Sequence, residues 1–130
     1  MKLLLDADVL IGALDGDDSH HRQARELFTS WREQQATPLI SVVNLTEVLI
    51  APAADRIRLA TAREAIAALG VSVHHPNEAI GVHAARLRHR HPISIPDAYC
   101  IATAKNTGST LISFDRMVLR AAEHERITAR

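Results

Sequence analysis

The chain has 130 residues, of which 47% are hydrophobic, so it is long enough for one buried core and too short for two ordinary domains. Lys and Arg together number 15, as do Asp and Glu, which excludes a global electrostatic field that would recruit or repel a polyanion. Cys100 is the only cysteine, which excludes an intramolecular disulfide, argues against a cysteine-based zinc site and suits a reducing cytoplasm.

The N-terminal third is predicted to contain one strand and two helices. Residues 2–5 are a mostly apolar run that ends at Asp6, which is typical of a buried strand. Residues 9–14 can form a short helix, and residues 17–19 offer N-caps for a second helix that extends to Gln35. This second helix has an apolar stripe formed by Ala24, Leu27, Phe28 and Trp31.

Three more strands and five more helices are predicted along the rest of the chain. The strands are short apolar runs at residues 39–43, 71–73 and 110–113. The helices cover residues 45–51 after the N-cap Asn44, then 54–69, 77–89, 97–106 and 117–124. Alternating strands and helices predict one α/β domain over residues 1–130, with a mostly parallel sheet covered by helices on both faces.

Four acids are expected to meet at one edge of this sheet. Asp6 and Asp115 follow predicted strands, whereas Glu47 and Asp97 lie at or near the starts of helices. In an open parallel sheet, the carboxyl ends of strands and the starts of the following helices share one edge, where catalytic crevices lie. Taken alone, Asp97 could merely favour the helix dipole and Asp115 could cap a helix, so the prediction rests on the set.

This set of acids predicts a metal-dependent enzyme. Convergent carboxylates repel one another, and a cation resolves the repulsion. Oxygen ligands without cysteine or an ordered histidine pair favour Mg²⁺ or Mn²⁺ over zinc, and Mg²⁺ held by a few carboxylates takes substrate phosphate as a further ligand. Because such a metal can polarise a phosphoryl group and activate a bound water, a phosphodiester is the expected substrate.

Four segments of the sequence resemble the PIN-domain family, in particular the VapC-type toxins of bacterial toxin–antitoxin pairs. They carry the four acids with an order and spacing similar to the family pattern, and the resemblance covers essentially the whole chain. The segments are LLLDADVLIGAL at residues 3–14, SVVNLTEVL at 41–49, ISIPDAYCIATAKNTG at 93–108 and TLISFDRMV at 110–118.

The resemblance implies a PIN-like α/β/α sandwich and a Mg²⁺- or Mn²⁺-dependent endoribonuclease. This nuclease would be the toxin of a type II toxin–antitoxin pair, its substrate a structured RNA such as tRNA or rRNA. The resemblance also implies a homodimer and inhibition by a cognate antitoxin. The metal-binding acids of the family carry over onto Asp6, Asp97 and Asp115, with Glu47 completing the catalytic site.

Two further residues are candidate auxiliaries of this site. Asp8 departs from the family pattern, which more often has Asn, Ser or Thr two places after the first acid. It would either add a metal ligand or tune the site through water. Ser113 matches a hydroxyl position two places before the fourth acid and could hold a metal-bound water or a phosphate.

Two other readings of the sequence compete with a nuclease. Asp6 and Asp8 after an apolar strand also resemble the opening of haloacid dehalogenase-like phosphatases, for which Ser41 and Lys105 would be further candidates. That chemistry needs a closing acidic pair, whereas Asp97 and Asp115 are separated. A third reading is a non-catalytic module of the same fold that binds RNA or protein, and the presence of all four acids argues against it.

Charged segments suggest how partners could bind. Arg86, Arg88 and Arg90 could contact RNA phosphates, although a solvated helix face explains them equally well. For the antitoxin, we expect an inserted Arg or Lys beside Asp6 and Asp97 that competes with the metal.

The sequence also predicts where the protein resides. Asp6 and Asp8 interrupt the apolar run that a signal peptide would need. The longest uncharged stretch, residues 37–46, falls short of the ~20 residues of a membrane-spanning helix. We therefore expect no export signal, no membrane span and a cytoplasmic location.

Overall fold

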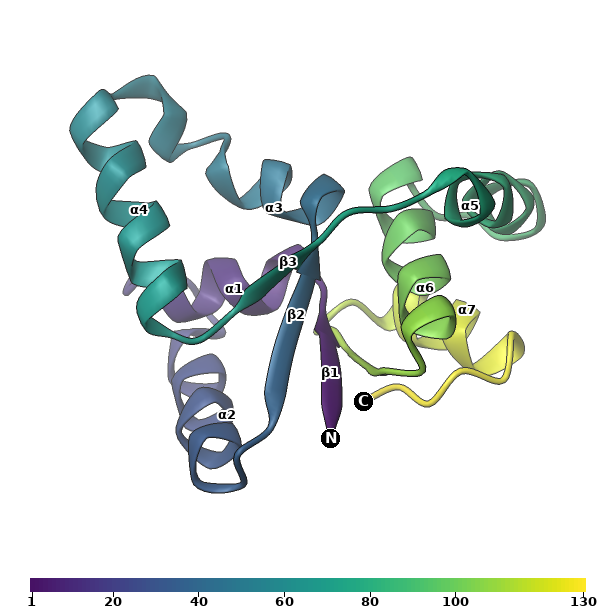
Figure 1. The fold of residues 1–130 in the computed structure, drawn as a ribbon, viewed down its shortest axis with the longest axis horizontal. Helices are drawn as coiled ribbons and strands as arrows, with labels where there is room; N and C mark the ends of the chain where they lie inside the picture. Colours follow the sequence, from purple (N-terminus) through teal and green to yellow (C-terminus); the bar gives the residue numbers. More distant parts are fainter.

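A four-stranded, all-parallel sheet lies at the centre of the computed structural model, which describes residues 1–130 (Figure 1). The strands are β1 (Lys2–Leu5), β2 (Thr37–Ser41), β3 (Ser72–His74) and β4 (Thr110–Ile112). The helices are α1 (Ala7–Leu14), α2 (His21–Glu33), α3 (Val42–Leu49), α4 (Arg56–Ala68), α5 (Glu78–Arg90), α6 (Ile95–Thr107) and α7 (Arg116–His124), with a 3₁₀ turn, η1 (Pro52–Ala54). The predicted α/β/α sandwich is confirmed.

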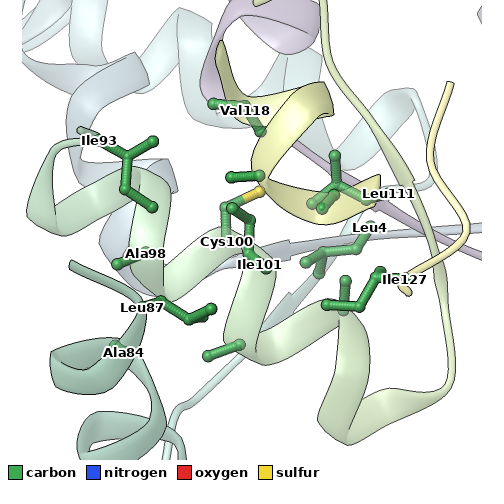
Figure 2. Close-up of a cluster of buried hydrophobic side chains, with 14 of the residues drawn as sticks. Leu4, Ala84, Leu87, Ile93, Ala98, Cys100, Ile101, Leu111, Val118 and Ile127 are labelled. Carbon is green, nitrogen blue, oxygen red and sulfur yellow. The ribbon is translucent and has the colours of Figure 1, made fainter. Parts of the chain in front are cut away.

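The alternating side chains of β1 separate two hydrophobic cores. Leu4 points into a core with α5, α6 and α7, which Figure 2 shows with Leu111 of β4 and the fully buried Cys100. Leu3 and Leu5 point to the opposite face, where α1, α2, α3 and α4 pack. Successive residues of a strand point to opposite faces, so one apolar run of three leucines supports both layers.

The order of the strands, β3-β2-β1-β4, fixes the position of the functional edge. The chain moves outward from β1 through β2 to β3 and then returns past β1 to place β4 on its other side. In open parallel sheets, ligands bind outside the carboxyl ends of the strands at such a reversal. In this fold the reversal lies between β1 and β4, which are followed by Asp6 and Ser113.

The start of α3 differs from the prediction. Residues 39–43 were expected to form a strand and Asn44 to cap the helix, but the helix begins at Val42. The reason is that the Ser41 side chain accepts a hydrogen bond from the Val43 N–H, at 3.3 Å, and so caps the helix three residues earlier. The predicted N-cap role of Asn44 is therefore wrong, and this buried side chain is free for another contact.

Other helix starts also differ from the expected ones, and helix α1 begins at Ala7 because Asp6 accepts the Ala7 N–H. Helix α2 begins at His21, and its N-cap His20 makes no side-chain capping bond, so the expected caps at residues 17–19 are wrong. Helix α6 begins at Ile95 rather than Asp97, because Ser94 and Asp97 form a reciprocal capping box. No helix is long and apolar enough to cross a membrane.

Candidate active site

The centre of the candidate site is a hydrogen bond between the ends of β1 and β4. The Ser113 hydroxyl donates to Asp6 Oδ2 at 2.7 Å, and its oxygen accepts the Asp115 backbone N–H at 3.0 Å. The backbone N–H of Asp6 also donates to the Ile112 carbonyl at 2.9 Å. Ser113 therefore connects the first and fourth acids, and its proton is committed to Asp6.

Asp8 faces the same edge from the first turn of α1. Its Oδ2 accepts the Phe114 N–H at 3.1 Å, which ties α1 to the turn after β4. Its other carboxylate oxygen, Oδ1, is buried and has no hydrogen-bond partner. A buried acceptor without a partner is costly, so this oxygen is available to a cation or a water.

Glu47 and Asp97 are brought together by Asn44. The Asn44 side-chain amide donates to Glu47 Oε1 at 3.2 Å and to the Pro96 carbonyl at 3.1 Å, immediately before Asp97. Asn44 thus positions one acid of α3 against the start of α6. This role of Asn44 was not predicted from the sequence, although the spacing of three residues between Asn44 and Glu47 on a helix favours a side-chain contact.

Asp97 and Asp115 each help to cap the start of a helix in addition to belonging to the site. Asp97 Oδ2 accepts the Ser94 backbone N–H at 3.3 Å, and Asp115 Oδ1 accepts the Met117 N–H at 2.8 Å. Asp115 is exposed, whereas Asp97 is half-buried. Both acids therefore stabilise a helix start, as each could have done without a catalytic role. These hydrogen bonds also fix the position of each carboxylate.

The structure brings the predicted acids together in electrostatic pairs. Asp6 is influenced by Asp8 and Asp97, Asp8 by Asp115, and Glu47 by Asp97. No group of three or more His, Cys, Asp or Glu side chains is spaced to hold a metal ion, so the acids form a chain of neighbours rather than a closed cluster. Like charges that repel one another favour this open arrangement.

Burial dominates the protonation of the inner acids. Desolvation raises the pKa of Asp6 to about 7, and the charge of Asp8 adds to the increase while the Ser113 hydrogen bond opposes it. Desolvation likewise raises the pKa of Asp8 to about 6, against the Phe114 hydrogen bond. The pKa of Glu47 is also raised, mainly by desolvation. These carboxyls are destabilised as anions by their surroundings.

The chemistry of the donor set suits a hard divalent cation, and the carboxylates would have to move closer together to hold one. Asp6, Glu47, Asp97 and Asp115 supply only oxygen ligands, and Asp8, with its orphaned oxygen, is an electrostatic neighbour of Asp6 and Asp115. Mg²⁺ and Mn²⁺ prefer such ligands, and a bound cation would offset the desolvation and the repulsion that raise the pKa of Asp6. These residues would hold the cation, with Ser113 orienting Asp6.

The other sequence candidates form no hydrogen bond or ion pair with the acids of this edge. Arg90 donates to Glu125 Oε1 at 2.7 Å and His91 contacts Oε2 of the same carboxylate at 2.7 Å, whereas Arg86 and Arg88 are exposed on α5. Ser41 caps α3, and Lys105 lies in the last turn of α6, the end opposite Asp97. Ser41 ends β2, the strand paired with β1, at the same edge as Asp6, but the Lys105 that the phosphatase reading requires lies at the far end of α6.

Comparisons with known proteins agree on the fold. A family model described as PIN domain matches residues 3–124. VapC20 of Mycobacterium tuberculosis, described as a sarcin–ricin loop cleaving toxin, superposes with a TM-score of 0.75 at 18% identity, over 92% of this chain and 94% of that one.

One chain from each of two VapBC structures superposes to a similar degree. VapBC2 of Rickettsia felis, bound to a promoter DNA fragment, gives a TM-score of 0.74 at 12% identity, over 100% of this chain and 98% of that one. DNA-bound VapBC of Salmonella typhimurium gives 0.73 at 18% identity, over 100% and 97%. No curated protein matches the sequence.

The raised pKa of Asp6 predicts that Asp6→Asn stabilises the fold at neutral and higher pH in the presence of a chelator. Between the ordinary pKa of an aspartic acid and about 7, the folded protein holds a proton that the unfolded chain releases, so stability falls as pH rises through this window. We expect a gain on the order of 1–3 kcal/mol at about pH 8 and little gain at about pH 4. Urea unfolding at both pH values measures it.

The matched control for this experiment is Asp17→Asn, which neutralises an exposed acid. It should leave the pH profile unchanged. Added Mn²⁺ should raise the melting temperature of the parent at about pH 8 but have much less effect on Asp6→Asn. An equal gain for Asp6→Asn at both pH values would contradict the burial argument.

Asn44→Ala should weaken both the fold and metal binding. It removes the donor shared by Glu47 and the Pro96 carbonyl, for which we expect a loss of about 1–3 kcal/mol in the free energy of unfolding and a smaller Mn²⁺-dependent thermal shift. The control Thr46→Ala lies on the same helix and is exposed. If both variants give the same thermal shift with Mn²⁺, Asn44 does not position the site.

Proposed function

Because this chain belongs to the PIN domain family, we propose that it is a metal-dependent endoribonuclease and the toxin of a toxin–antitoxin pair. The observation that carries the proposal is the buried Asp6 carboxylate at the switch between β1 and β4, hydrogen-bonded to Ser113 and influenced by Asp8 and Asp97. Acids held together at the carboxyl edge of a parallel sheet are suited to bind a cation and a phosphodiester.

The proposed roles of the residues follow from their surroundings. Asp6, Glu47, Asp97 and Asp115 would hold Mg²⁺ or Mn²⁺, which when bound polarises the phosphoryl group and lowers the pKa of a coordinated water. Asp8 has a partnerless oxygen and a pKa raised to about 6, so it is suited to accept a proton near neutral pH. Ser113 keeps Asp6 oriented by donating to it.

Arginines along α7 support a polyanionic substrate. Arg116 directly follows Asp115, and Arg116, Arg120 and Arg126 line one hollow between α7 and the segment after it, together with Glu123. None of the three arginines is paired with a carboxylate. Unpaired arginines in one hollow, the first of them directly after Asp115, can neutralise RNA phosphates on a chain with no net charge. The contribution predicted for Arg86 and Arg88 stays a prediction.

A groove beside the acids is suited to the antitoxin that we propose as partner. It lies between α1, α3 and α4 and combines the apolar residues Ile11, Val48 and Ile57 with the acids Asp15 and Glu47. Ile57 is 77% exposed, an unusual position for a large apolar side chain. An amphipathic antitoxin segment could bury Ile57 while its Arg or Lys meets Glu47. The homodimer implied by the family resemblance stays a prediction.

Cleavage of RNA by the purified chain tests the proposal. The protein, freed of any co-purified inhibitor, is incubated with total bacterial RNA in Mg²⁺, in Mn²⁺ and in chelator. We expect discrete, metal-dependent fragments, and a loss of at least about a hundredfold in rate for Asp97→Asn. The control Glu33→Gln neutralises an exposed acid at the end of α2 and should retain the parent rate.

Each other result of this experiment has a defined meaning. RNA binding without cleavage in any metal would favour the non-catalytic module. Fragments that persist in chelator or in Asp97→Asn would come from another nuclease or another site, and would contradict the roles assigned to the acids.

A further inference from the structure

Two stacked aromatic rings lie beside the acids. The imidazole of His20, at the start of α2, stacks on the Phe114 ring with centroids 4.4 Å apart and planes inclined by 16°. The two residues are 94 positions apart in the sequence and meet because the loop before α2 folds over the turn after β4. The rings of this pair, which we name the His20–Phe114 stack, form no hydrogen bond with the acids described above.

Phe114, the inner residue of the stack, is linked to the acidic site through its backbone. Phe114 lies between Ser113 and Asp115 in the chain, and its backbone N–H donates to Asp8 Oδ2 at 3.1 Å. Burial raises the pKa of Asp8, and a protonated His20 would oppose part of this increase because the imidazole is close to that carboxylate. A group bound against the stack would therefore be adjacent to any group bound by the acids.

The stack is rigid on its inner side and open on its outer side. Phe114 packs against the core formed by α1, α2, α3 and α4. The His20 backbone N–H donates to Asp18 Oδ2 at 2.9 Å, and its ring Nδ1 lies 3.7 Å from the same oxygen. The His20 side chain is nevertheless 44% exposed. A ring held in a fixed orientation with free surface can bind a planar ligand at a low cost in side-chain entropy.

The other large aromatic rings of the chain are not available at this edge. Phe28 and Trp31 are buried in α2 and contact each other with centroids 4.9 Å apart. Tyr99 is half-buried and packs against Gly81 of α5. With two Phe, one Trp and one Tyr in the whole sequence, the His20–Phe114 stack is the one aromatic surface next to the acids.

We propose that the His20–Phe114 stack is a binding platform for a nucleobase next to the scissile phosphate. The proposal rests on the ribonuclease function proposed above and adds a specificity-determining residue to it. Unstacked bases of single-stranded or looped RNA bind proteins by stacking on aromatic and imidazole rings, and every base has a suitable face. A base on the outer face of His20 would extend a stack that already reaches the core, while its phosphate points to the acids.

Variants that lack the platform should bind RNA more weakly, whereas their acidic site should be unchanged. The probes are single-stranded RNA 12-mers of mixed sequence, one set carrying 2-aminopurine, measured in the Asp97→Asn background so that they are not cut. We expect His20→Ala to weaken binding by roughly tenfold and to reduce the quenching of 2-aminopurine. His20→Phe should restore both, because a neutral ring can still stack. Phe114→Leu, which keeps the apolar packing, should resemble His20→Ala.

Cleavage assays on His20 variants that retain Asp97 distinguish the platform from the proposed ribonuclease function as a whole. His20→Ala should raise KM more than it lowers kcat and should change the nucleotide preference at the fragment ends, while the Mn²⁺-dependent thermal shift stays that of the parent. The control His89→Ala removes an exposed histidine of α5 and should change none of these measurements.

Three outcomes would overturn the platform. The first is parent-like binding and fragment ends for His20→Ala with active parent protein, which leaves the nuclease in place without the stack. The second is failure of His20→Phe to restore binding, which would assign the effect to the charge of His20. The third is a parent protein that neither binds nor cuts RNA, in which case both proposals fail together.

Discussion

The burial of one carboxyl group, that of Asp6, governs the rest of this structure. The chain reverses its direction across the sheet between β1 and β4, and Asp6 ends the central strand at that point. Only 5% of Asp6 is exposed, so its charge has lost most of its water. The Ser113 hydroxyl and the Ala7 N–H compensate part of that loss. The remainder is an electrostatic penalty that the cation we propose for this edge would offset.

The acidic site therefore lowers the stability of the fold in favour of its proposed function. The inner carboxyls keep raised pKa values, and the oxygens Asp8 Oδ1 and Asn44 Oδ1 are buried without partners. The fold tolerates this because two separate hydrophobic cores flank the sheet, joined by a strand whose three leucines are fully buried. A destabilised polar edge between two well-packed layers is a common arrangement for a catalytic site.

The sequence predicted the fold and the four acids better than the contacts between them. Short apolar runs identified the strands, and Gly70 and Gly108 follow helices with the positive φ angles expected of them. The start of α3 was misplaced because two consecutive valines favour a strand, whereas the Ser41 cap decides for a helix. The link from Asn44 to Pro96 and the stack of His20 on Phe114 depend on tertiary packing, which local patterns do not encode.

The contact of Glu125 with Arg90 and His91 has an evolutionary consequence. Glu125 ends α7, the helix that begins at Asp115, and His91 lies three residues before Ser94, which caps the helix of Asp97. A contact on the outside of the molecule thus joins the end of α7 to the segment before α6. Evolution can therefore alter how α7 is placed against that segment through substitutions at this remote joint, with every residue of the carboxyl edge of the sheet retained.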